Sequence, residues 1–507
     1  MLWWFKSPLE SDRRLWEHPI LSFHRGRKVK FLFEGREVEA YEGESVAVAL
    51  YAAGINVYSW SPSLHRPRGP FCMIGKCSSC FMVVNGVPNV RTCREPVKDG
   101  LMVERQAGWV PPPSPHNDSI GSQSREEELR TDVLIVGGGP AGLAAAIKLS
   151  EYGLDVTLVD EHFKLGGQLL KQTHKFFGSQ ELFGGLRGFQ VAEKLISKLR
   201  EVSNVRIFTE TTAFGVFRGG VVGLASRDSV VWVKPRAVIA STGAQERYLD
   251  FINNDLPGVI GAGGVQTLMN EFGVKPGEEA LVVGSGNVGV IVSYQLLQAG
   301  VKVRAVLELL PEIGGWFVHA AKLRRYGVPI LTSHTIKAAL GSERVEGAVI
   351  TAVDERFKPV EGSEEVIKCD LILLAVGLEP DARLHAQAGA VMKWVPELGG
   401  LVPVRTEYLE TSVPSMYVAG DASGIEEATT AMVEGWVAAL AIASKMVDGS
   451  KAEKALNELT KYNKFLWSEY RSSPVIARAR KGKESVTVTQ EEMERLRATY
   501  PPPIHFR

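Results

Sequence analysis

Residues 132–153, DVLIVGGGPAGLAAAIKLSEYG, decide the fold of this chain of 507 residues. An apolar run leads into a glycine-rich turn and then into helix-forming residues, so the stretch predicts a strand, a turn and a helix. Glycines occupy all three positions of G-x-G-x-x-G, where they permit a tight turn, a close approach of a pyrophosphate and close packing of helix on strand. We therefore expect a nucleotide to contact Gly137, Gly139, Pro140, Ala141 and Gly142.

Such a loop is followed, about twenty residues later, by an acidic side chain that bonds a ribose. Asp160 and Glu161 stand at the end of the next predicted strand, in LDVTLVDEHF, and Gly167 and Gln168 complete the predicted site. The motif recognises only the ADP half of a cofactor, so FAD, NAD and ATP all stay open. The alternative is a glycine-rich packing turn that binds no ligand.

A second strand–turn–helix unit lies at residues 279–300, EALVVGSGNVGVIVSYQLLQAG, with Gly284, Gly286 and Gly289 in the same spacing. Glu308 ends the following strand, where an acid selects NAD. A duplicated domain can keep its glycine turn for packing after it has lost its ligand. For this second fold, nucleotide binding and a packing turn without a ligand both remain open.

Three further segments, AVIASTGAQER, LILLAVGLEPDARL and TSVPSMYVAGDAS, follow these loops in a fixed order. Together with the two loops they resemble the two-dinucleotide-domain flavoproteins of the glutathione and thioredoxin reductase class, over about residues 130–447. The resemblance implies that the chain crosses into the inserted domain at Thr242 and Gly243. It also implies that Gly420 and Asp421 contact a flavin. Beyond Cys93 the only cysteine is Cys369, so the thiol pair of a disulfide reductase is missing.

Four of the five cysteines, Cys72, Cys77, Cys80 and Cys93, have the spacing C-x4-C-x2-C-x12-C. C-x4-C-x2-C is typical of the loop that holds a plant-type [2Fe–2S] cluster, so these thiols are the predicted ligands. A structural zinc usually needs two separate C-x2-C knuckles, and here there is one. Zinc, and a site that has lost its cluster, remain the alternatives.

The segments on either side of the cysteines predict a small β-grasp domain. Apolar residues alternate at Val29, Phe31 and Phe33, Ser45 precedes a short helix, and Asn85-Gly86 is typical of a type I′ hairpin turn. Near the other end, Thr489 and Glu492 have the spacing of a capping box. Residues 498–507 are predicted to dock on another subunit, and a frayed terminus is the alternative.

Lys plus Arg and Asp plus Glu each number 58, so the net charge of zero does not favour a nucleic-acid partner. No apolar run reaches the ~20 residues that span a bilayer, and no signal peptide is evident, so a cytoplasmic protein is expected. The predicted divisions are 1–106 for the β-grasp domain, 107–130 for a linker, 131–250 with 375–450 for the first nucleotide domain, 251–374 for the inserted NAD-type domain and 451–507 for a helical tail.

The phrases HRPRGPFCMIGKCSSC, GVPNVRTC and FINNDLPGVIGAGGVQTLMN narrow the resemblance. The chain is similar to the α subunits of dye-linked L-proline dehydrogenases, in a wider family with sarcosine oxidase α, opine oxidase and hydrogen cyanide synthase flavoprotein subunits. The family implies a β subunit of glycine-oxidase type that oxidises the amine, and an FMN at the subunit contact. Sarcosine oxidase α subunits are about twice as long, and some relatives end in a second cluster domain, for which residues 451–507 have no cysteine.

We therefore predict an α/β chain with two Rossmann-like domains after a β-grasp domain, acting as the electron-transfer subunit of a hetero-oligomeric amino-acid dehydrogenase. Its donor is expected to be L-proline and its acceptor a small molecule. No acid–base or nucleophile constellation in the sequence points to substrate chemistry by this chain. One rival is a self-sufficient NAD(P)H:acceptor oxidoreductase with FAD and the cluster. The other is a non-catalytic scaffold stabilised by a nucleotide.

Overall fold

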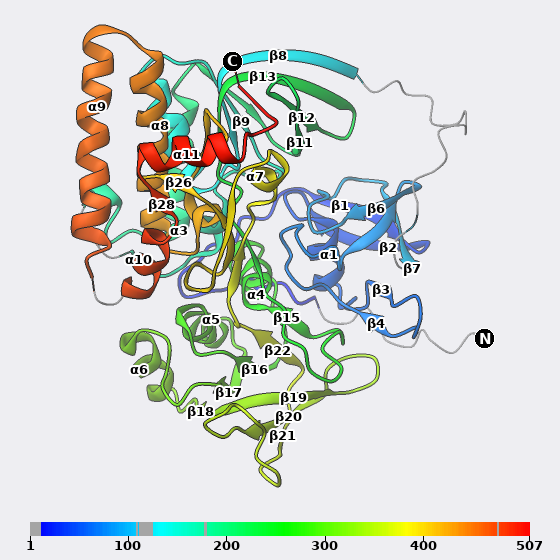
Figure 1. The fold of residues 1–507 in the computed structure, drawn as a ribbon. Helices are drawn as coiled ribbons and strands as arrows, with labels where there is room; N and C mark the ends of the chain where they lie inside the picture. Colours follow the sequence, from blue (N-terminus) through cyan, green and yellow to red (C-terminus); the bar gives the residue numbers. More distant parts are fainter. Residues whose placement is uncertain (1–11, 108–109, 111–124, 177–179, 474–475, 507) are drawn as a thin grey trace. The chain divides into compact units, whose positions relative to one another are not determined.

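The computed structural model describes all residues except 1–11, 108–109, 111–124, 177–179, 474–475 and 507 (Figure 1). The chain divides into two compact units. Unit 1 consists of Met1–Asp118 with Glu246–Gly377, and unit 2 of Ser119–Gln245 with Leu378–Arg507. The chain passes between them near the short strands β14 (Ala244–Glu246) and β23 (Leu378–Pro380).

The N-terminal part of unit 1 is a mixed sheet in the order β2-β1-β7-β3-β4, with β5 paired to β6 and β7. Helix α1 (Val46–Ala52) begins after Ser45, whose hydroxyl accepts a hydrogen bond from Val48 N at 3.4 Å, which confirms the predicted cap. Asn85 and Gly86 have φ values of 50° and 79°, so the predicted hairpin turn is confirmed. The strands are β1 (Lys28–Phe33), β2 (Arg36–Tyr41), β3 (Ser59–Trp60), β4 (Pro67–Arg68), β5 (Phe81–Val84), β6 (Val87–Arg91) and β7 (Met102–Ala107).

The rest of unit 1 is a parallel sheet in the order β15-β22-β16-β17-β18, with a separate antiparallel sheet β19-β20-β21. Its strands are β15 (Val259–Gly261), β16 (Glu279–Val283), β17 (Lys302–Glu308), β18 (Ile330–Thr332), β19 (His334–Leu340), β20 (Gly347–Ala352), β21 (Glu365–Ile367) and β22 (Leu371–Leu374). Its helices are α4 (Ala262–Gln266), which continues into a π-helical turn (Thr267–Glu271), α5 (Asn287–Gln298) and α6 (Phe317–Arg325).

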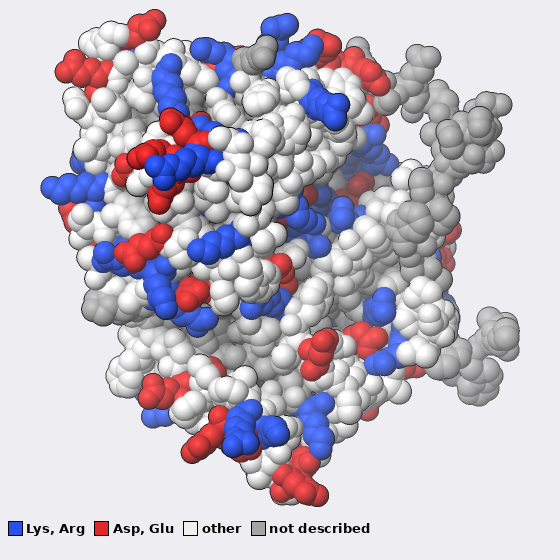
Figure 2. Space-filling view, in the orientation of Figure 1, with Lys and Arg blue, Asp and Glu red and all other residues white. Residues whose placement is uncertain are grey.

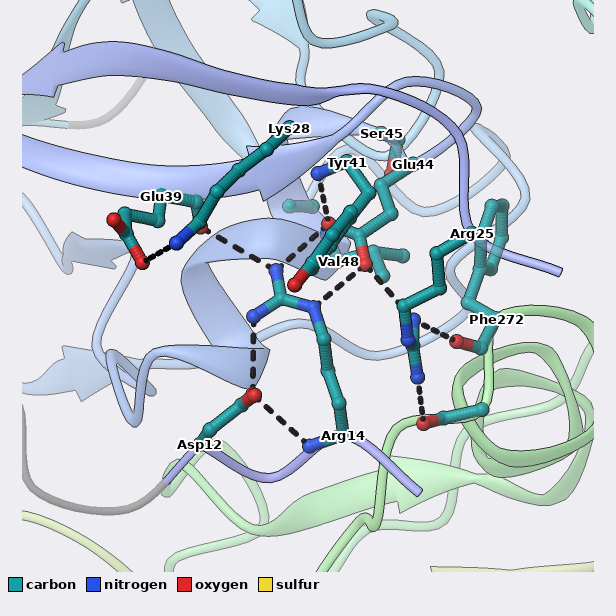
Figure 3. Close-up of polar contacts among 12 residues, drawn as sticks. Asp12, Arg14, Arg25, Lys28, Glu39, Tyr41, Glu44, Ser45, Val48 and Phe272 are labelled. Carbon is teal, nitrogen blue, oxygen red and sulfur yellow. Dashed lines mark hydrogen bonds and ion pairs between the residues drawn. The ribbon is translucent and has the colours of Figure 1, made fainter. Parts of the chain in front are cut away.

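A buried ion pair ties the β-grasp domain to this nucleotide domain (Figure 3). The Arg14 guanidinium donates to both carboxylate oxygens of Glu44 at 2.7 Å, and both side chains are 5% exposed. Arg25 donates to Glu44 at 3.1 Å and also to the carbonyls of Phe272 and Gly273 at 3.3 and 3.1 Å. The N-terminal segment therefore joins the two halves of unit 1 through charge-assisted hydrogen bonds.

Unit 2 is built on a sheet in the order β10-β9-β8-β13-β12-β11, with β27 also paired to β13. Helix α8 (Ala428–Met446) crosses α2 (Pro140–Glu151) closely, because a Cβ on Gly435 would lie 2.2 Å from the Ala141 carbonyl oxygen. The strands are β8 (Arg125–Val136), β9 (Val156–Val159), β10 (Val205–Phe208), β11 (Thr212–Phe217), β12 (Val221–Ala225), β13 (Ser229–Ala240), β24 (Met392–Val395), β25 (Gly400–Pro403), β26 (Arg405–Thr406) and β27 (Met416–Val418); the other helices of this domain are α3 (Gly188–Arg200) and α7 (Arg383–Gln387).

The two crossings between the units lie near the predicted limits of the inserted domain, and strand β8 begins inside the predicted linker. Strand β8 begins at Arg125, because the charged residues 125–130 pair in parallel with residues 229–234 of β13, whereas the predicted linker reached residue 130. Residues 108–109 and 111–124 of that linker lie outside the described residues. The units change after Gln245 and after Gly377, close to the predicted 250 and 374.

The C-terminal segment is part of unit 2. Helix α9 (Gly449–Lys464) lies alongside α8 (Figure 1) and ends in a π-helical turn (Phe465–Tyr470). Helix α10 (Ala477–Glu484), strand β28 (Thr487–Val488) and helix α11 (Gln490–Thr499) follow, and the capping box at the start of α11 is present as predicted. Ile504 and Phe506 are buried in a core with Val216 and Val222 of the same unit. The prediction that these two side chains dock on another subunit is therefore wrong.

On the face drawn in Figure 2, acidic and basic side chains are interspersed. In the described part of the chain, no helix combines the length and the apolar character needed to cross a bilayer. The cytoplasmic location stays a prediction.

Candidate functional site

The first glycine loop has the geometry that its motif predicts. Gly137 has φ 109°, and a Cβ there would lie 2.3 Å from the Ser241 carbonyl oxygen. A Cβ on Gly142 would lie 1.8 Å from the Gly137 carbonyl oxygen, so any side chain would push α2 off the strand. At Gly139 the nearest contact of such a Cβ is the Gly167 Cα, at 4.0 Å. Two glycines are thus required for packing, and Gly139, the N-cap of α2, leaves room for a ligand.

Asp160 fixes this loop from the end of β9. Its carboxylate accepts hydrogen bonds from Gly138 N at 2.6 Å and from His162 N at 2.7 Å. Burial raises the pKa of Asp160, and these two N–H groups act against that rise. Glu161 beside it is half-buried. Of the predicted pair, Asp160 therefore lies directly against the loop.

Gly167 faces the loop from the following short 3₁₀ helix (Gly167–Lys171). Gly167 has φ 52°, and a Cβ added there would lie 2.9 Å from the Gly139 Cα. Gln168 lies in the same turn and is exposed. The structure therefore brings Gly167 to the site, and it leaves Gln168 at the surface.

Thr242 and Gly243 follow β13 where the chain turns away from the sheet. The Thr242 hydroxyl donates to the Asp381 carbonyl at 2.5 Å, and Asp381 N donates back to the Gly243 carbonyl at 2.9 Å. No described atom apart from its chain neighbours would lie within 4 Å of a Cβ on Gly243. The two segments that lead into the inserted domain are thus bonded to each other within unit 2.

The turn with Gly420 and Asp421 lies against the first turn of α2, since a Cβ on Gly420 would be 3.1 Å from the Ala141 Cβ. Burial raises the pKa of Asp421 to about 6, although Glu426 N donates to it at 3.3 Å and Lys483 attracts its negative charge. A partly buried carboxylate with a shifted pKa beside a glycine loop is typical of a cofactor site. The first loop and this turn therefore form one candidate site.

Sequence reasoning missed Glu434, whose carboxylate lies under this turn. It accepts from Gly420 N at 2.9 Å and from the Ser423 hydroxyl at 2.6 Å. Burial alone would raise the pKa of Glu434, yet the neighbouring cations, first Lys483 and then Arg471, lower it to about 2. A lone acid in the apolar helix AMVEGWVAALAIA was the available signal, because a buried charge needs a partner.

The second loop repeats the geometry of the first. Gly284 has φ 104°, and a Cβ on Gly289 would lie 2.0 Å from the Gly284 carbonyl oxygen. A Cβ on Gly286 would meet no described atom within 4 Å apart from its chain neighbours. Glu308 accepts from Ser285 N at 3.0 Å and from the Ser285 hydroxyl at 2.6 Å. The predicted positions of the second nucleotide site therefore come together in unit 1.

The cysteine loop points backbone N–H groups at its sulfur atoms. Cys72 Sγ accepts from Ile74 N at 3.5 Å and from Cys77 N at 3.4 Å, and Cys77 Sγ accepts from Ser79 N at 3.5 Å. Such N–H groups stabilise the negative charge of cluster thiolates. The loop geometry therefore fits the predicted ligands.

The four thiols lie close enough to influence one another: Cys77 raises the pKa of Cys72, and Cys80 raises the pKa of Cys93. Among the described residues, no three His, Cys, Asp or Glu side chains are placed to hold one metal ion. The spacing C-x4-C-x2-C is the feature that favours a [2Fe–2S] cluster over a single zinc. Cys369 is a separate buried residue in the core of unit 1.

The cysteine loop packs on the nucleotide domain of unit 1. Phe71 and Cys72 share a hydrophobic core with residues of that domain, and the Phe71 carbonyl accepts from Gly261 N at 3.2 Å. The Tyr248 ring stacks on Phe71 with centroids 4.3 Å apart, and the neighbouring Cys77 adds to the rise that burial causes in the pKa of Tyr248. Tyr248 is a contact of the predicted cluster that sequence reasoning missed.

Two family models match the chain. Residues 131–435 match pyridine nucleotide-disulphide oxidoreductase, and residues 26–108 match a 2Fe-2S iron-sulfur cluster binding domain. The predicted fold class, two Rossmann-like domains after a ferredoxin-like domain, is confirmed by these matches and by the sheet topology.

Individual relatives agree with these models. The sarcosine oxidase alpha chain of Rhizobium meliloti (strain 1021) is 27% identical over 83% of this chain and 46% of its own length, so this chain spans less than half of that relative. An opine oxidase subunit of Agrobacterium tumefaciens (strain Ach5) is 30% identical over 61% of this chain and 65% of its own. The crystal structure of L-proline dehydrogenase from P. horikoshii is similar with a TM-score of 0.65 and 30% identity, covering 88% of this chain and 79% of that one. This chain therefore belongs to the pyridine nucleotide-disulphide oxidoreductase family, in the group that includes sarcosine oxidase alpha subunits, opine oxidase subunits and L-proline dehydrogenase.

Proposed function

We propose that this chain is the electron-transfer flavoprotein subunit of a hetero-oligomeric amino-acid dehydrogenase that oxidises L-proline. The observation that carries the proposal is the 30% identity to an L-proline dehydrogenase over 88% of the chain. The relatives named as subunits of sarcosine oxidase and opine oxidase support a partner. In this proposal a β subunit of the glycine-oxidase type takes the electrons from the amine, and an FMN lies at the subunit contact.

The first loop would hold an adenine nucleotide. This would be FAD, or ATP or NAD if this chain transfers electrons without a flavin of its own. The α2 N-terminus at Gly139 would face its pyrophosphate, and Asp160 would hold the loop in shape. Asp421 would accept a hydrogen bond from the bound cofactor. Its surroundings raise the pKa of its carboxyl group, so charge at this contact is only partly screened by water.

The cysteine loop would hold the cluster through Cys72, Cys77, Cys80 and Cys93, whose thiols lie close enough to shift one another's pKa. A [2Fe–2S] cluster supplies one-electron transfer when bound. The chain's own residues orient the thiolates through backbone N–H groups and keep them in a packed core. A small-molecule acceptor would take the electrons from the assembled enzyme.

A second candidate function is an NAD(P)H:acceptor oxidoreductase that needs no partner. The observation that favours it is the second loop, where Gly286 leaves space and Glu308, which accepts from Ser285 N, would contact a ribose. An acid there selects NADH over NADPH, because it would repel a 2′-phosphate.

The test compares the chain alone with the chain co-expressed with a β subunit of the glycine-oxidase type. Anaerobic spectra of the chain alone, before and after dithionite, report the cluster and any flavin. The dehydrogenase proposal predicts that L-proline reduces a redox dye only with the co-expressed complex, and that NADH leaves the spectrum of the chain alone unchanged. NADH bleaching in the chain alone would instead support the partner-free oxidoreductase.

A matched pair of variants tests the scaffold rival. Gly139→Asp and Gly286→Asp each place a carboxylate where a phosphate would lie. The electron-transfer proposal predicts that Gly139→Asp lowers turnover per intact complex. If Gly139→Asp only destabilises the complex and leaves turnover per complex unchanged, the nucleotide is a structural plug and the scaffold hypothesis is correct.

A further inference from the structure

Two cations from the C-terminal segment are buried beneath the turn that carries Asp421. Arg471 follows the π-helical turn after α9, and Lys483 lies in α10, and both side chains are 1% exposed. Their partners are Glu434, 1% exposed, and Glu426, 6% exposed. We call these four residues the buried ion network. Charged side chains are almost never this deeply buried unless they are paired, so the network is a specific feature.

Glu434 is the centre of the network. One of its carboxylate oxygens accepts from Gly420 N at 2.9 Å and from the Ser423 hydroxyl at 2.6 Å. The other accepts from Arg471 at 2.5 Å and from Lys483 at 2.9 Å. One side of the carboxylate therefore holds the turn, and the other side is neutralised by the C-terminal segment.

Two further contacts connect the same cations to the turn. Lys483 Nζ donates to the Ser423 hydroxyl at 2.6 Å. Arg471 and Lys483 both contact the Glu426 carboxylate, at 2.5 and 3.2 Å, and Glu426 N donates to Asp421 at 3.3 Å. Glu434 in α8 and Glu426 just before α8 both bond the turn. Both are thus paired with the same two cations.

Removing one partner of a buried ion pair leaves an uncompensated charge in a low-dielectric interior. If Lys483 were replaced by an uncharged side chain, Glu434 would lose a cation and Ser423 would lose a donor. The carboxylate could be relieved by water entry or by a proton, and either change weakens its hydrogen bonds to the turn. Since this turn lies against the first helical turn of α2, its displacement would alter the candidate nucleotide site.

We propose that Arg471 and Lys483 are positioning residues for the first nucleotide site, which they build through Glu434 and Glu426 without touching the nucleotide. The C-terminal segment is then a required part of that site rather than an appendage. This inference rests on the proposed binding of FAD, ATP or NAD at the first loop. Its test must separate a loosened turn from a general loss of stability.

The variant is Lys483→Met, which keeps the length of the side chain and removes its charge. Arg14→Met is the matched control, because it breaks a buried Arg–Glu pair that belongs to unit 1 (Figure 3), whereas the first loop belongs to unit 2. Two quantities are measured: FAD affinity by fluorescence titration, with ATP titrated separately, and hydrogen exchange of the Gly420–Ser423 amides in the nucleotide-free chain.

We expect Lys483→Met to weaken FAD binding by about tenfold or more and to speed exchange at Gly420–Ser423. Arg14→Met should leave both unchanged even if it lowers the melting temperature. Unchanged exchange and unchanged affinity in a folded Lys483→Met chain would overturn the inference. If the wild-type chain binds neither FAD nor ATP, the proposed cofactor is wrong, and the exchange data alone still decide whether Lys483 positions the turn.

A charge-balanced double variant covers the case in which Lys483→Met alone does not fold. Glu434→Gln with Lys483→Met removes one charge of each sign, and the new amide side chain keeps an acceptor for Gly420 N. Its FAD affinity should lie between those of the wild type and Lys483→Met, because the Lys483–Ser423 contact is still lost. Wild-type affinity in the double variant would show that Lys483 does not position the turn.

Discussion

Both glycine loops have a glycine at the point where the helix packs closely on the loop before it. A Cβ would lie 1.8 Å from a carbonyl oxygen at Gly142 and 2.0 Å at Gly289. Asp160 in one loop and Glu308 in the other accept a backbone N–H of the loop that they follow. The geometry of the loops alone therefore does not distinguish a complete nucleotide-binding site from a packing turn.

Their surroundings differ. The first loop has a second wall, the turn at Gly420 and Asp421, which α8 and the buried ion network hold in place. The second loop is followed by exposed apolar side chains, among them Leu310 at 47% and Phe317 at 83% exposure. Each loop makes the backbone shape that a dinucleotide needs, but only the first is joined, within its own unit and among the described residues, to such a buried turn. The contrast predicts tight binding at the first loop and weaker, exchangeable binding at the second.

The largest expected effect comes from placing a side chain in each loop. Gly142→Val and Gly289→Val both force a methyl group into a carbonyl oxygen, and overpacking of this kind costs about 1–3 kcal/mol. Gly142→Val should weaken FAD binding by about 10- to 100-fold and leave NADH binding intact. Gly289→Val should do the reverse. Fluorescence titrations with FAD and NADH check both, and equal effects of both variants on both ligands would mean that the loops are not separate sites.

The local part of this comparison could be predicted from the sequence. The roles of Gly137, Gly142 and Asp160 depend on one strand, one turn and one helix, whose residues are close together in the chain. The same holds for the hairpin at Asn85-Gly86, because its backbone shape follows from two residues.

The second wall could not be predicted in the same way. Arg471 and Lys483 reach the Asp421 turn only through the packing of α9 and α10, and a charged helical tail is typical of a solvated surface. The burial of Ile504 and Phe506 in their own unit depends on the same packing. Strand β8 was predicted to begin too late because REEELR has no apolar pattern, although its backbone pairs with β13. In each case, contacts between segments far apart in the sequence decide the outcome.

A pH experiment tests the second wall directly. Burial raises the pKa of Asp421 to about 6, above the ~3.9 of an unfolded aspartate, so the folded chain binds this proton more tightly than the unfolded chain does. Ionisation of Asp421 therefore lowers the stability of the nucleotide-free chain above about pH 6, and this loss disappears below about pH 4. Asp421→Asn should raise stability at pH 7 by about 2 kcal/mol and weaken FAD binding.

Urea unfolding of the nucleotide-free chain at pH 7 and near pH 4 measures this difference. The gain in stability from Asp421→Asn should be present at the higher pH and nearly absent at the lower one. A gain that is equal at both values would mean that Asp421 does not titrate as a buried carboxylate.

A smaller effect is expected at the second loop. Glu308→Gln keeps the shape of the side chain but weakens its bonds to Ser285, and hydrogen bonds to charged groups contribute about 1.5–3 kcal/mol. NADH binding should weaken by about tenfold, with FAD binding unchanged. Asp160→Asn is the matched variant in the first loop and should affect FAD instead. A loss of FAD in Glu308→Gln would contradict the assignment of the two loops.

The smallest expected effect concerns Tyr248, through which the nucleotide domain of unit 1 contacts the predicted cluster. The Tyr248 side chain lies close enough to Cys77 for that thiol to affect the pKa of the tyrosine, and a polar hydroxyl beside a cluster thiolate favours the reduced, more negative state. Tyr248→Phe removes this hydroxyl and keeps the ring that stacks on Phe71. We expect the midpoint potential of the cluster to fall by about 30–60 mV, since 59 mV corresponds to a tenfold change for one electron. Tyr51→Phe is the control, because the Tyr51 hydroxyl donates to the Pro276 carbonyl, and its potential should match the wild type. An EPR-monitored redox titration decides between them: equal potentials for Tyr248→Phe and the wild type would mean that unit 1 holds the cysteine loop in place without tuning it.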